Sequence, residues 1–292
     1  MHALITGAGG FVGGAISRVF LGAGWKVTGL CRKRRPAGLG GPQFDVVESD
    51  LEALQGLPDR YDFLVHCAAE VPAYCPDEER LYRSNVDGTR RLLEHAHGAG
   101  AAGVAYMSSM AVYGEISVPV VSESTAPGKT SVYGKSKAEG ETALAGWASG
   151  KRAAVSIRLP GVVGAGGRNN FLCDTLQIVL AGGQVTASNP QAPFNNVVHV
   201  GDLAAFVAAL PGRMPAGHQP LTIAASDPLP MRGVLARLHE RAGKPERVRW
   251  QEDGAAPFLI SFERARSLGY RPASVADSID RFVADTVAAG AP

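Results

Sequence analysis

The stretch "TGAGGFVG", residues 6–13, decides the fold that this sequence predicts. It begins at the end of "HALIT", an apolar run that is typical of a strand. It leads into "GGAISRVFLGAG", where apolar residues recur at helical spacing before a glycine stop. Gly7, Gly10 and Gly13 therefore stand at a strand-to-helix turn with the spacing GxxGxxG.

Each glycine of this turn has a physical use in a dinucleotide site. The first permits the tight turn, the second lets the backbone approach a pyrophosphate, and the third lets the helix pack against the strand. The helix N-terminus adds N–H groups and a partial positive charge. We expect a cofactor to contact Gly7, Gly10, Phe11, Val12 and Gly13. The alternative is a turn without a ligand, in a chain that has 36 glycines.

The rest of the first half alternates between strand-like and helix-like segments. Strands are expected at 2–6, 26–31, 44–50, 61–69, 104–109 and 153–159, and helices at 13–24, 81–100 and 132–148. The fourth strand is nearly all apolar, as expected for a strand buried on both faces. This alternation predicts an α/β protein with a Rossmann-type, doubly wound parallel sheet.

After Pro160 the pattern loosens into a glycine-rich loop. Further helices are expected at 171–183, 231–243 and 274–290, a strand at 218–225, and a strand followed by a helix at 194–210, capped near Asp202. We interpret 1–160 as a dinucleotide-binding domain to which 193–225 returns. A small C-terminal substrate-binding lobe is expected from 161–192 and 226–292.

Bulk composition fits a globular protein of 292 residues, with 46% hydrophobic and 19% charged residues. The net charge of +2 does not point to nucleic acid as a partner. The four cysteines form no CxxC pair and match no zinc spacing, so we expect reduced thiols and no metal. With no leader pattern and no apolar run of about 18 residues, a cytoplasmic protein with no membrane partner is expected.

The end of the second strand bears on the choice of cofactor. An NAD site needs an acid there for the ribose 2′-OH, but Cys31 stands at that position and Arg32 follows. With Lys33 or Arg34 nearby, cations are available for a 2′-phosphate, which favours NADP over NAD. A solvated basic loop remains the alternative for Arg34 and Arg35.

A second acidic position follows the third strand. Asp50 and Leu51 stand there and are candidates for contact with the adenine edge. The alternative for Asp50 is an ordinary helix N-cap.

Tyr133 and Lys137 are four residues apart on a predicted helix and therefore share a face. A tyrosine with a pKa near 10 is a poor base, and a neighbouring ammonium lowers that pKa by favouring phenolate. Upstream, Ser108 and Ser109 end a predicted parallel strand, at the edge where ligands bind. Serine, tyrosine and lysine behind a dinucleotide turn form a coherent hydride-transfer site. The alternative is a surface tyrosine and lysine with no joint role.

Taken together, these motifs make the chain resemble the extended short-chain dehydrogenase/reductase family, in particular its NAD(P)-dependent epimerase/dehydratase group acting on nucleotide sugars. The motifs that carry the resemblance span most of the chain: "TGAGGFVG", "LVHCAA", "SNVDGT", "SSMAVYG", "YGKSK" and "VVHVGDLA". The resemblance implies that Ser109, Tyr133 and Lys137 are catalytic, with Tyr133 as the acid/base. Lys137 would also hold the nicotinamide ribose and lower the pKa of the tyrosine.

The resemblance also implies further contacts with the cofactor and with the substrate. Besides the glycine turn, those to the cofactor come from Arg32, Asp50, Leu51, Ala68, Ala69, Asn85, Ser108, Tyr133, Lys137, Pro160 and Val162. Those to the substrate come from Ser109, Met110, Tyr133, Arg168, Asn169 and Asn170, of which the last three are expected near a diphosphate. Gly134 would be tolerated in its helix because the turn packs against the cofactor. A solvent-exposed loop remains the alternative for Arg168, and loop stabilisation for His199.

Two departures from the family pattern narrow the reaction. Nucleotide-sugar dehydratases carry Asp-Glu directly after the catalytic threonine, whereas Met110 and Ala111 stand here. No acid is supplied there to protonate a leaving hydroxyl, which disfavours dehydration. In the motif "VVHVGDLA", Gly201 stands where the family often has an acid. The chain is also short for the group, and this shortness implies a reduced lobe for binding the nucleotide.

The prediction is an oxidoreductase that reduces a 4-keto nucleotide sugar with NADPH. The alternatives are a 4-epimerase with tightly bound NAD, a reductase of a non-sugar carbonyl, and a non-catalytic dinucleotide sensor. Because both Tyr133 and Lys137 are kept, the sensor is disfavoured. The resemblance further implies a homodimer formed through roughly 81–98 and 133–149.

Overall fold

A seven-stranded parallel sheet forms the centre of the molecule, with strand order β12-β7-β5-β4-β1-β2-β3. The computed structural model describes residues 1–33, 36, 38–252, 254 and 256–290. The strands of this sheet are β1 (His2–Thr6), β2 (Lys26–Cys31), β3 (Phe44–Glu48), β4 (Phe63–His66), β5 (Gly103–Ser109), β7 (Ala153–Leu159) and β12 (Gly217–Thr222). The α/β, Rossmann-type prediction is confirmed.

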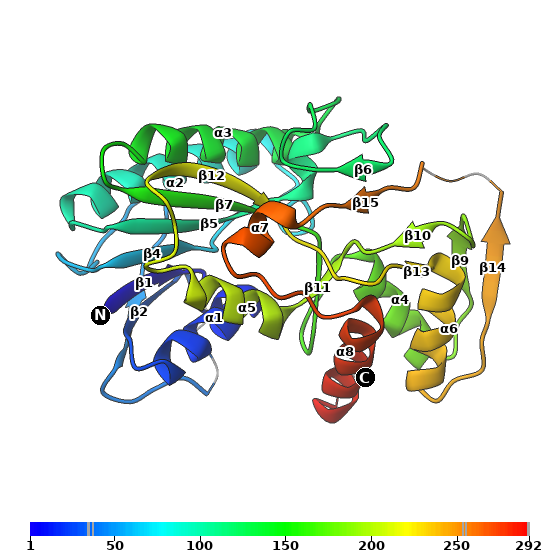
Figure 1. The fold of residues 1–292 in the computed structure, drawn as a ribbon. Helices are drawn as coiled ribbons and strands as arrows, with labels where there is room; N and C mark the ends of the chain where they lie inside the picture. The colour runs from blue at the N-terminus through cyan, green and yellow to red at the C-terminus, as the bar shows by residue number, and fades with distance from the viewer. Residues whose placement is uncertain (34–35, 37, 253, 255, 291–292) are drawn as a thin grey trace.

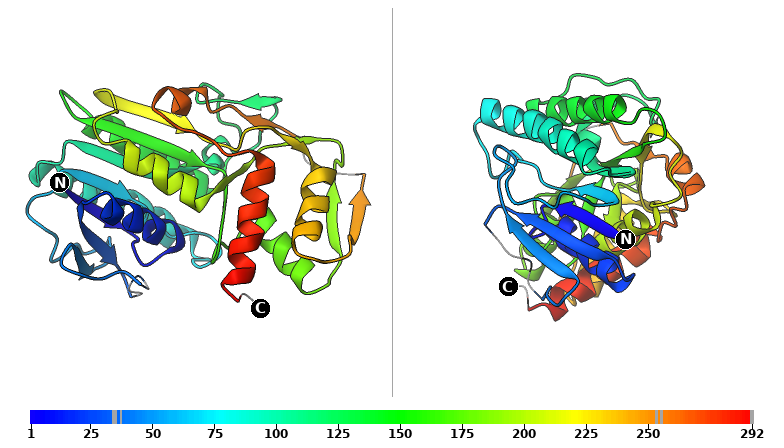
Figure 2. Two further views of the ribbon diagram at one scale, coloured as in Figure 1. Left: turned by 60° about the horizontal axis from the view of Figure 1, so that its bottom comes forward. Right: turned by 90° about the vertical axis from the view of Figure 1, so that its left-hand side faces the viewer.

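Helices cover both faces of the sheet (Figures 1 and 2). On one face α2 (Glu78–Gly98) packs against α3 (Val132–Trp147), and on the other α1 (Phe11–Gly22) packs against α5 (Val200–Ala209). Each layer buries its own apolar cluster against the sheet, which is why β1, β4 and β5 are apolar on both faces.

The sheet order changes direction between β1 and β4, because β1 leads through α1 to β2 on one side while β4 lies on the other. In open α/β sheets, ligands bind beyond the carboxyl ends of the strands at such a point. The glycine turn after β1 and the loop after β4 meet there.

A separate apolar core lies beyond the carboxyl ends of the central strands, at the right of Figure 1. Both segments predicted for the substrate lobe contribute to it. Its elements include α4 (Phe171–Leu180), β9 (Val185–Ser188), α6 (Met231–Arg241), β14 (Val248–Gln251) and α8 (Val275–Ala288). β9 and β14 pair in parallel.

Short elements that the sequence did not predict connect this lobe to the central sheet. They are a 3₁₀ turn η1 (Met110–Tyr113), α7 (Glu263–Ser267), and the strands β6 (Val120–Val121), β8 (Gly161–Val163), β10 (Pro193–Phe194), β13 (Leu229–Pro230) and β15 (Leu259–Ile260). The short strand predicted before α5 is confirmed as β11 (Val197–His199). β8 pairs with β11 and β6 with β15, so widely separated segments share the junction.

The cap of α5 differs from the sequence prediction. The helix begins at Val200, and its cap is His199, whose Nδ1 accepts a hydrogen bond from the Gly201 N–H at 3.2 Å. Asp202, the predicted cap, lies in the first turn and accepts a hydrogen bond from Arg281 on α8. His199 also contacts Asp285 of α8 at 3.0 Å, which supports the loop-stabilising interpretation of this histidine. Within the described residues, no helix is both long and apolar enough to cross a bilayer.

Candidate active site

The glycine turn brings the ends of β1 and β4 into direct contact. Gly7 has a φ of +67°, and a β-carbon there would lie 3.0 Å from the Ala68 nitrogen. A β-carbon on Gly13 would lie 2.3 Å from the Gly7 carbonyl oxygen, because α1 packs closely against the turn. Only glycine fits at these two positions without displacing the backbone.

Two cavities flank the turn. One of about 170 Å³ is lined by Gly7, Leu30, Arg32, Ser49, Asp50, Leu51, Ala68, Ala69, Glu70 and Ser84. The other, of about 550 Å³, includes Gly10, Phe11, Arg18, Arg168 and Asn169 in its wall, at the N-terminus of α1. The first suits an adenosine, and the second suits a diphosphate because it combines helix N–H groups with two arginines. The residues present therefore fit a dinucleotide.

The loop after β4 is held by two buried side chains. Thr6 Oγ1 accepts hydrogen bonds from the backbone N–H groups of Cys67 and Ala68, at 3.2 and 3.1 Å. Asn85 accepts from the Glu70 N–H at 2.8 Å and donates to the Glu70 carbonyl at 3.0 Å and to Ser136 Oγ at 3.1 Å. Asn85 thus joins this loop to α3 through buried side-chain contacts, and its contact with the cofactor stays a prediction.

No helix begins after Asp50, so the alternative interpretation of this residue as a helix N-cap is wrong. Asp50 Oδ1 accepts from the Glu52 N–H at 3.1 Å within a turn. Leu51 is buried in the wall of the smaller cavity. Its side chain packs against Gly88 of α2, where an added β-carbon would lie 2.8 Å from Leu51 Cβ. The adenine-edge role of both residues stays a prediction.

Arg32 has a partner that the sequence did not reveal. Its Nη1 donates to the carboxylate of Glu70, a residue that directly follows Ala68 and Ala69. The end of β2 itself carries no acid, but Glu70 from the loop after β4 places a carboxylate beside Arg32. Arg34 and Arg35, the rest of the basic run, lie outside the described residues.

Ser109, Tyr133 and Lys137 come together at the carboxyl end of β5. The Ser109 side chain lies next to the Tyr133 phenol, close enough to influence its pKa. The Lys137 ammonium donates to the Met107 carbonyl at 2.9 Å and lies 5.8 Å from the centre of the Tyr133 ring. Leu159 pairs with Ser109 in the sheet, so Pro160 and β8, including Val162, continue directly beside the serine.

The pKa shifts of this group differ from the sequence expectation. Burial raises the pKa of the Tyr133 phenol above its usual value, and the neighbouring Ser109 side chain partly opposes this rise. Burial lowers the pKa of Lys137 to about 8, against the opposing influence of Cys67 and Glu141. Tyr133 is therefore a neutral phenol at neutral pH, a form that can donate a proton.

Gly134 is explained by packing, but not against the cofactor. A β-carbon there would lie 2.0 Å from Thr130 Oγ1 and 2.2 Å from the Ala111 carbonyl oxygen. Thr130 also donates its hydroxyl to that carbonyl at 2.6 Å. The glycine lets α3 approach η1, the turn that directly follows Ser109.

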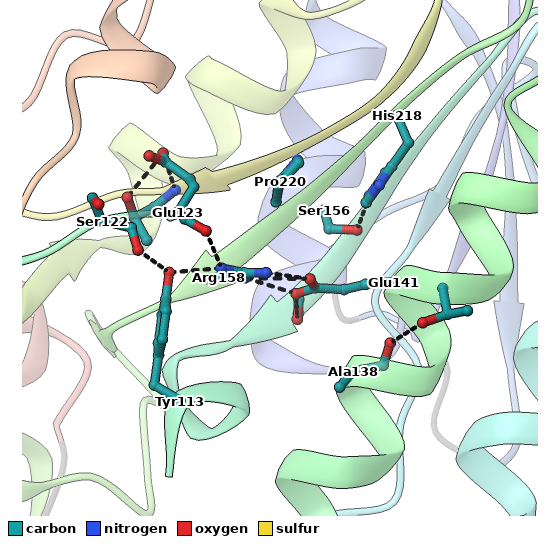
Figure 3. Close-up of polar contacts among 12 residues, drawn as sticks. Tyr113, Ser122, Glu123, Ala138, Glu141, Ser156, Arg158, His218 and Pro220 are labelled. Carbon is teal, nitrogen blue, oxygen red and sulfur yellow. Dashed lines mark hydrogen bonds and ion pairs between the residues drawn. The ribbon is translucent and has the colours of Figure 1, made fainter. Parts of the chain in front are cut away.

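Ser108 does not direct its hydroxyl to the predicted cofactor site. It is buried, and its hydroxyl donates to Glu141 of α3 at 2.6 Å. Figure 3 shows Glu141 facing Arg158 of β7, which donates from Nη2 to Glu141 at 2.7 Å and from Nη1 to Tyr113 at 2.7 Å. Adjacent strand residues point to opposite faces, which places this cluster behind Ser109.

Met110 also differs from its predicted role. Its side chain is buried in an apolar cluster with Val112, Tyr113, Val121, Ala224 and Ile260. This cluster joins η1 to β6 and β15. The structure therefore shows Met110 packing between the sheet and the lobe, and its contact with a substrate stays a prediction.

The three residues predicted near a substrate diphosphate occupy two different places, and their contact with a substrate stays a prediction. Arg168 and Asn169 line the cavity at the N-terminus of α1, and Asn169 donates to Tyr74 at 2.8 Å. Asn170 caps α4 by accepting from the Cys173 N–H at 3.1 Å and donates to the Val162 carbonyl at 3.1 Å. Arg168 and Asn169 are thus on the cofactor side, because the loop 164–169 folds back over Phe11.

A further cavity of about 360 Å³ lies in the lobe, and the sequence did not predict it. Its described lining includes Phe171, Ser188, Phe194, Asn196, Gln251 and Phe258, and all the described residues that line it are uncharged. The Asn196 carbonyl oxygen lies 3.3 Å from where a Gly161 β-carbon would be, which places the cavity next to the start of β8. Only folding joins these segments, so no local pattern could reveal it.

Comparison with known proteins places the chain in a family. The model of the NAD dependent epimerase/dehydratase family matches residues 3–220, and the chain belongs to that family. D-erythronate dehydrogenase from Cupriavidus necator is 29% identical, over 96% of this chain and 97% of the relative. The 2'-dehydrokanamycin reductase of Streptomyces kanamyceticus is 31% identical, over 84% of this chain and 68% of the relative.

A solved structure confirms the fold. UDP-glucuronic acid 4-epimerase from Bacillus cereus, in complex with NAD, superposes with a TM-score of 0.85 and covers 99% of each chain at 20% identity. The relatives therefore include dehydrogenases, reductases and epimerases that share this architecture.

Replacing Gly134 by alanine tests the packing of α3 on η1. The added methyl group must displace Thr130 or the Ala111 carbonyl, and such overpacking costs about 1–3 kcal/mol of unfolding free energy. Gly146→Ala is the matched control on the same helix, because nothing lies within 4 Å of its β-carbon position. In thermal melts, we expect the first variant to melt below and the second at or above the parent. Equal melting of the two variants would contradict this packing account.

Proposed function

We propose that this protein is an NADP(H)-dependent oxidoreductase that reduces a carbonyl group to a hydroxyl group, with Tyr133 as the proton donor. The observation that carries the proposal is the convergence of Ser109, Tyr133 and Lys137 at the carboxyl end of β5, where the Lys137 ammonium lies 5.8 Å from the centre of the Tyr133 ring. Family membership and the cavities around the glycine turn support the cofactor class.

Each side chain has a defined task in this reaction. The nicotinamide, when bound, supplies the hydride to the carbonyl carbon. The Ser109 hydroxyl holds the carbonyl oxygen, and Tyr133 gives that oxygen its proton. Lys137, held by the Met107 carbonyl, is placed to bind the nicotinamide ribose and to stabilise the phenolate that remains. Because its pKa is not lowered, Tyr133 carries its proton at neutral pH, as proton donation in the reduction requires.

NADP is the form favoured by the end of β2, where Cys31 replaces an acid and Arg32 and Lys33 follow. Arg18 and Arg168, on either side of the larger cavity, are placed to contact the diphosphate. NAD remains the alternative, and the UDP-glucuronic acid 4-epimerase of similar fold is a complex with NAD.

The substrate class follows from the lobe cavity beside β8. The family resemblance suggests a 4-keto nucleotide sugar, and a 4-epimerase would act on the same class. A nucleotide sugar carries a diphosphate, which binds best to arginine, lysine or a helix N-terminus. The described lining of the lobe cavity is uncharged, which favours a carbonyl substrate without a nucleotide. Asn196 lines this cavity, and its Oδ1 is buried without a hydrogen-bond partner among the described residues.

Tyr133→Phe tests the role of the phenol. The variant should lose NADPH oxidation by about 10²–10⁴-fold with any ketone that the parent reduces, because the proton donor is gone. Suitable ketones are a UDP-linked 4-keto sugar, a keto-polyol and a hydroxylated aromatic ketone. Its affinity for NADPH, measured by fluorescence, should stay within about threefold of the parent. Unchanged turnover would rule out Tyr133 as the acid.

The pH profile of reduction tests the state of Lys137. The ammonium is present below its pKa of about 8 and is lost above it, while the phenol of Tyr133 stays protonated because its pKa is raised. We therefore expect kcat/KM for reduction to be flat near neutral pH and to fall as pH rises through about 8. A value that stays constant or increases through this range would contradict the assignment.

Binding of UDP separates the two substrate classes. An uncharged cavity should bind UDP weakly, with a Kd above about 1 mM by calorimetry, in protein saturated with NADP. Inosine or uridine, which lack the diphosphate, should bind no more weakly than UDP. Micromolar binding of UDP would restore the nucleotide-sugar interpretation and leave the role of Tyr133 intact.

A further inference from the structure

Arg32 and Glu70 form an ion pair at the wall of the smaller cavity beside the glycine turn. The Arg32 side chain is 51% exposed, whereas that of Glu70 is 10% exposed. The backbone of Glu70 is fixed on both sides by Asn85, so the carboxylate is the rigid partner. Arg80 approaches the same carboxylate oxygen at 3.9 Å.

This pair separates two cavities. Arg32, Asp50 and Glu70 line both the 170 Å³ cavity and an outer cavity of about 560 Å³ that also touches Lys33, Asp77 and Arg80. An adenosine in the inner cavity would present its ribose 2′ position to this wall. Three cations and three carboxylates line the outer cavity, so the wall is balanced in charge.

A 2′-phosphate and a 2′-hydroxyl place opposite demands on this wall. The phosphate needs the donors of Arg32, and a carboxylate that already binds those donors both competes for them and repels the new charge. The hydroxyl instead donates a hydrogen bond to a carboxylate, which NAD sites supply at the end of the second strand. In this chain the second strand ends in Cys31, and Glu70 supplies a carboxylate from the β4 loop.

We propose that Glu70 sets the choice between NADP and NAD by holding the guanidinium of Arg32. This inference rests on the proposed dinucleotide-dependent function. Glu70 moderates the preference for NADP that the basic strand end creates, and the site accepts both dinucleotides. A bound 2′-phosphate takes Arg32 from Glu70, whereas a bound 2′-hydroxyl leaves the pair intact.

Titration calorimetry of the full chain with NADP and NAD, at one fixed salt concentration and without substrate, tests this. Glu70→Gln keeps the side-chain shape and removes its charge. It should raise the ratio of NADP to NAD affinity at least about tenfold over the parent. Glu79→Gln, an exposed position on α2 outside both cavities, is the matched control for a change of charge and should leave the ratio within about twofold.

Arg32→Met makes the test a double-mutant cycle. Alone, it should lower affinity for NADP about tenfold and leave affinity for NAD within about threefold. In the Arg32→Met background, Glu70→Gln should change the ratio clearly less than in the parent, because competition for the guanidinium is gone and only the direct effects of the carboxylate remain. A Glu70→Gln effect that is as large without Arg32 as with it, or no effect in the parent, would overturn the proposal.

Two further outcomes separate this inference from the proposed function. Binding is measured without a carbonyl substrate. A shifted ratio of NADP to NAD affinity in a protein that reduces no ketone would therefore support the inference and contradict the proposed function. Turnover with an unchanged ratio would overturn the inference and leave the proposed function standing.

If Glu70→Gln fails to fold, as shown by circular dichroism, the charge-retaining Glu70→Asp should raise the ratio of NADP to NAD affinity by drawing the carboxylate back from Arg32. An unchanged ratio in that variant would overturn the proposal.

Discussion

The contact on which the site depends is the packing of α3 against the end of β5. Lys137 crosses from the helix to the Met107 carbonyl at 2.9 Å, and Gly134 removes the side chain that would keep the helix away from η1. These two contacts determine where α3 lies against the end of β5, and therefore how far Tyr133 is from Ser109. A third, the hydrogen bond from Ser108 to Glu141, holds the same strand end from its other face. Tyr133 is therefore positioned by backbone and buried contacts that need no bound ligand.

Burial has consequences for chemistry as well as for position. Desolvation disfavours charged forms, so the same surroundings keep Tyr133 protonated and bring the pKa of Lys137 to about 8. A neutral phenol next to an ammonium is the arrangement required to give a proton to a carbonyl oxygen. Glu141 and Arg158 complete the layer behind the site, and their buried pairing ties α3 to β7. These contacts join α3 to β5 and β7, and they hold Tyr133 in place.

Local sequence patterns were enough for most of the fold and part of the site. The glycine turn and the Tyr133–Lys137 pair could be predicted because their geometry follows from spacings of three or four residues along the chain. Arg32 and Glu70 are 38 residues apart, and Glu141 and Arg158 are 17 residues apart on different elements, so their pairing depends on the folded sheet. Ser108 and Ser109 show the limit most clearly, since one register step decides which hydroxyl faces the site. The lobe cavity is assembled from several distant segments, so no local pattern could show which cavity Arg168, Asn169 and Asn170 line, and their substrate contacts stay predictions.

The central claim is that the site performs net hydride transfer with an exchangeable cofactor. The most direct test is mass spectrometry of the small molecules released when the purified, dialysed protein is denatured. This account predicts much less than one dinucleotide per chain, because a reductase must exchange its cofactor at each turnover. Close to one NAD per chain, retained through dialysis, would contradict the account and indicate an epimerase that recycles its cofactor.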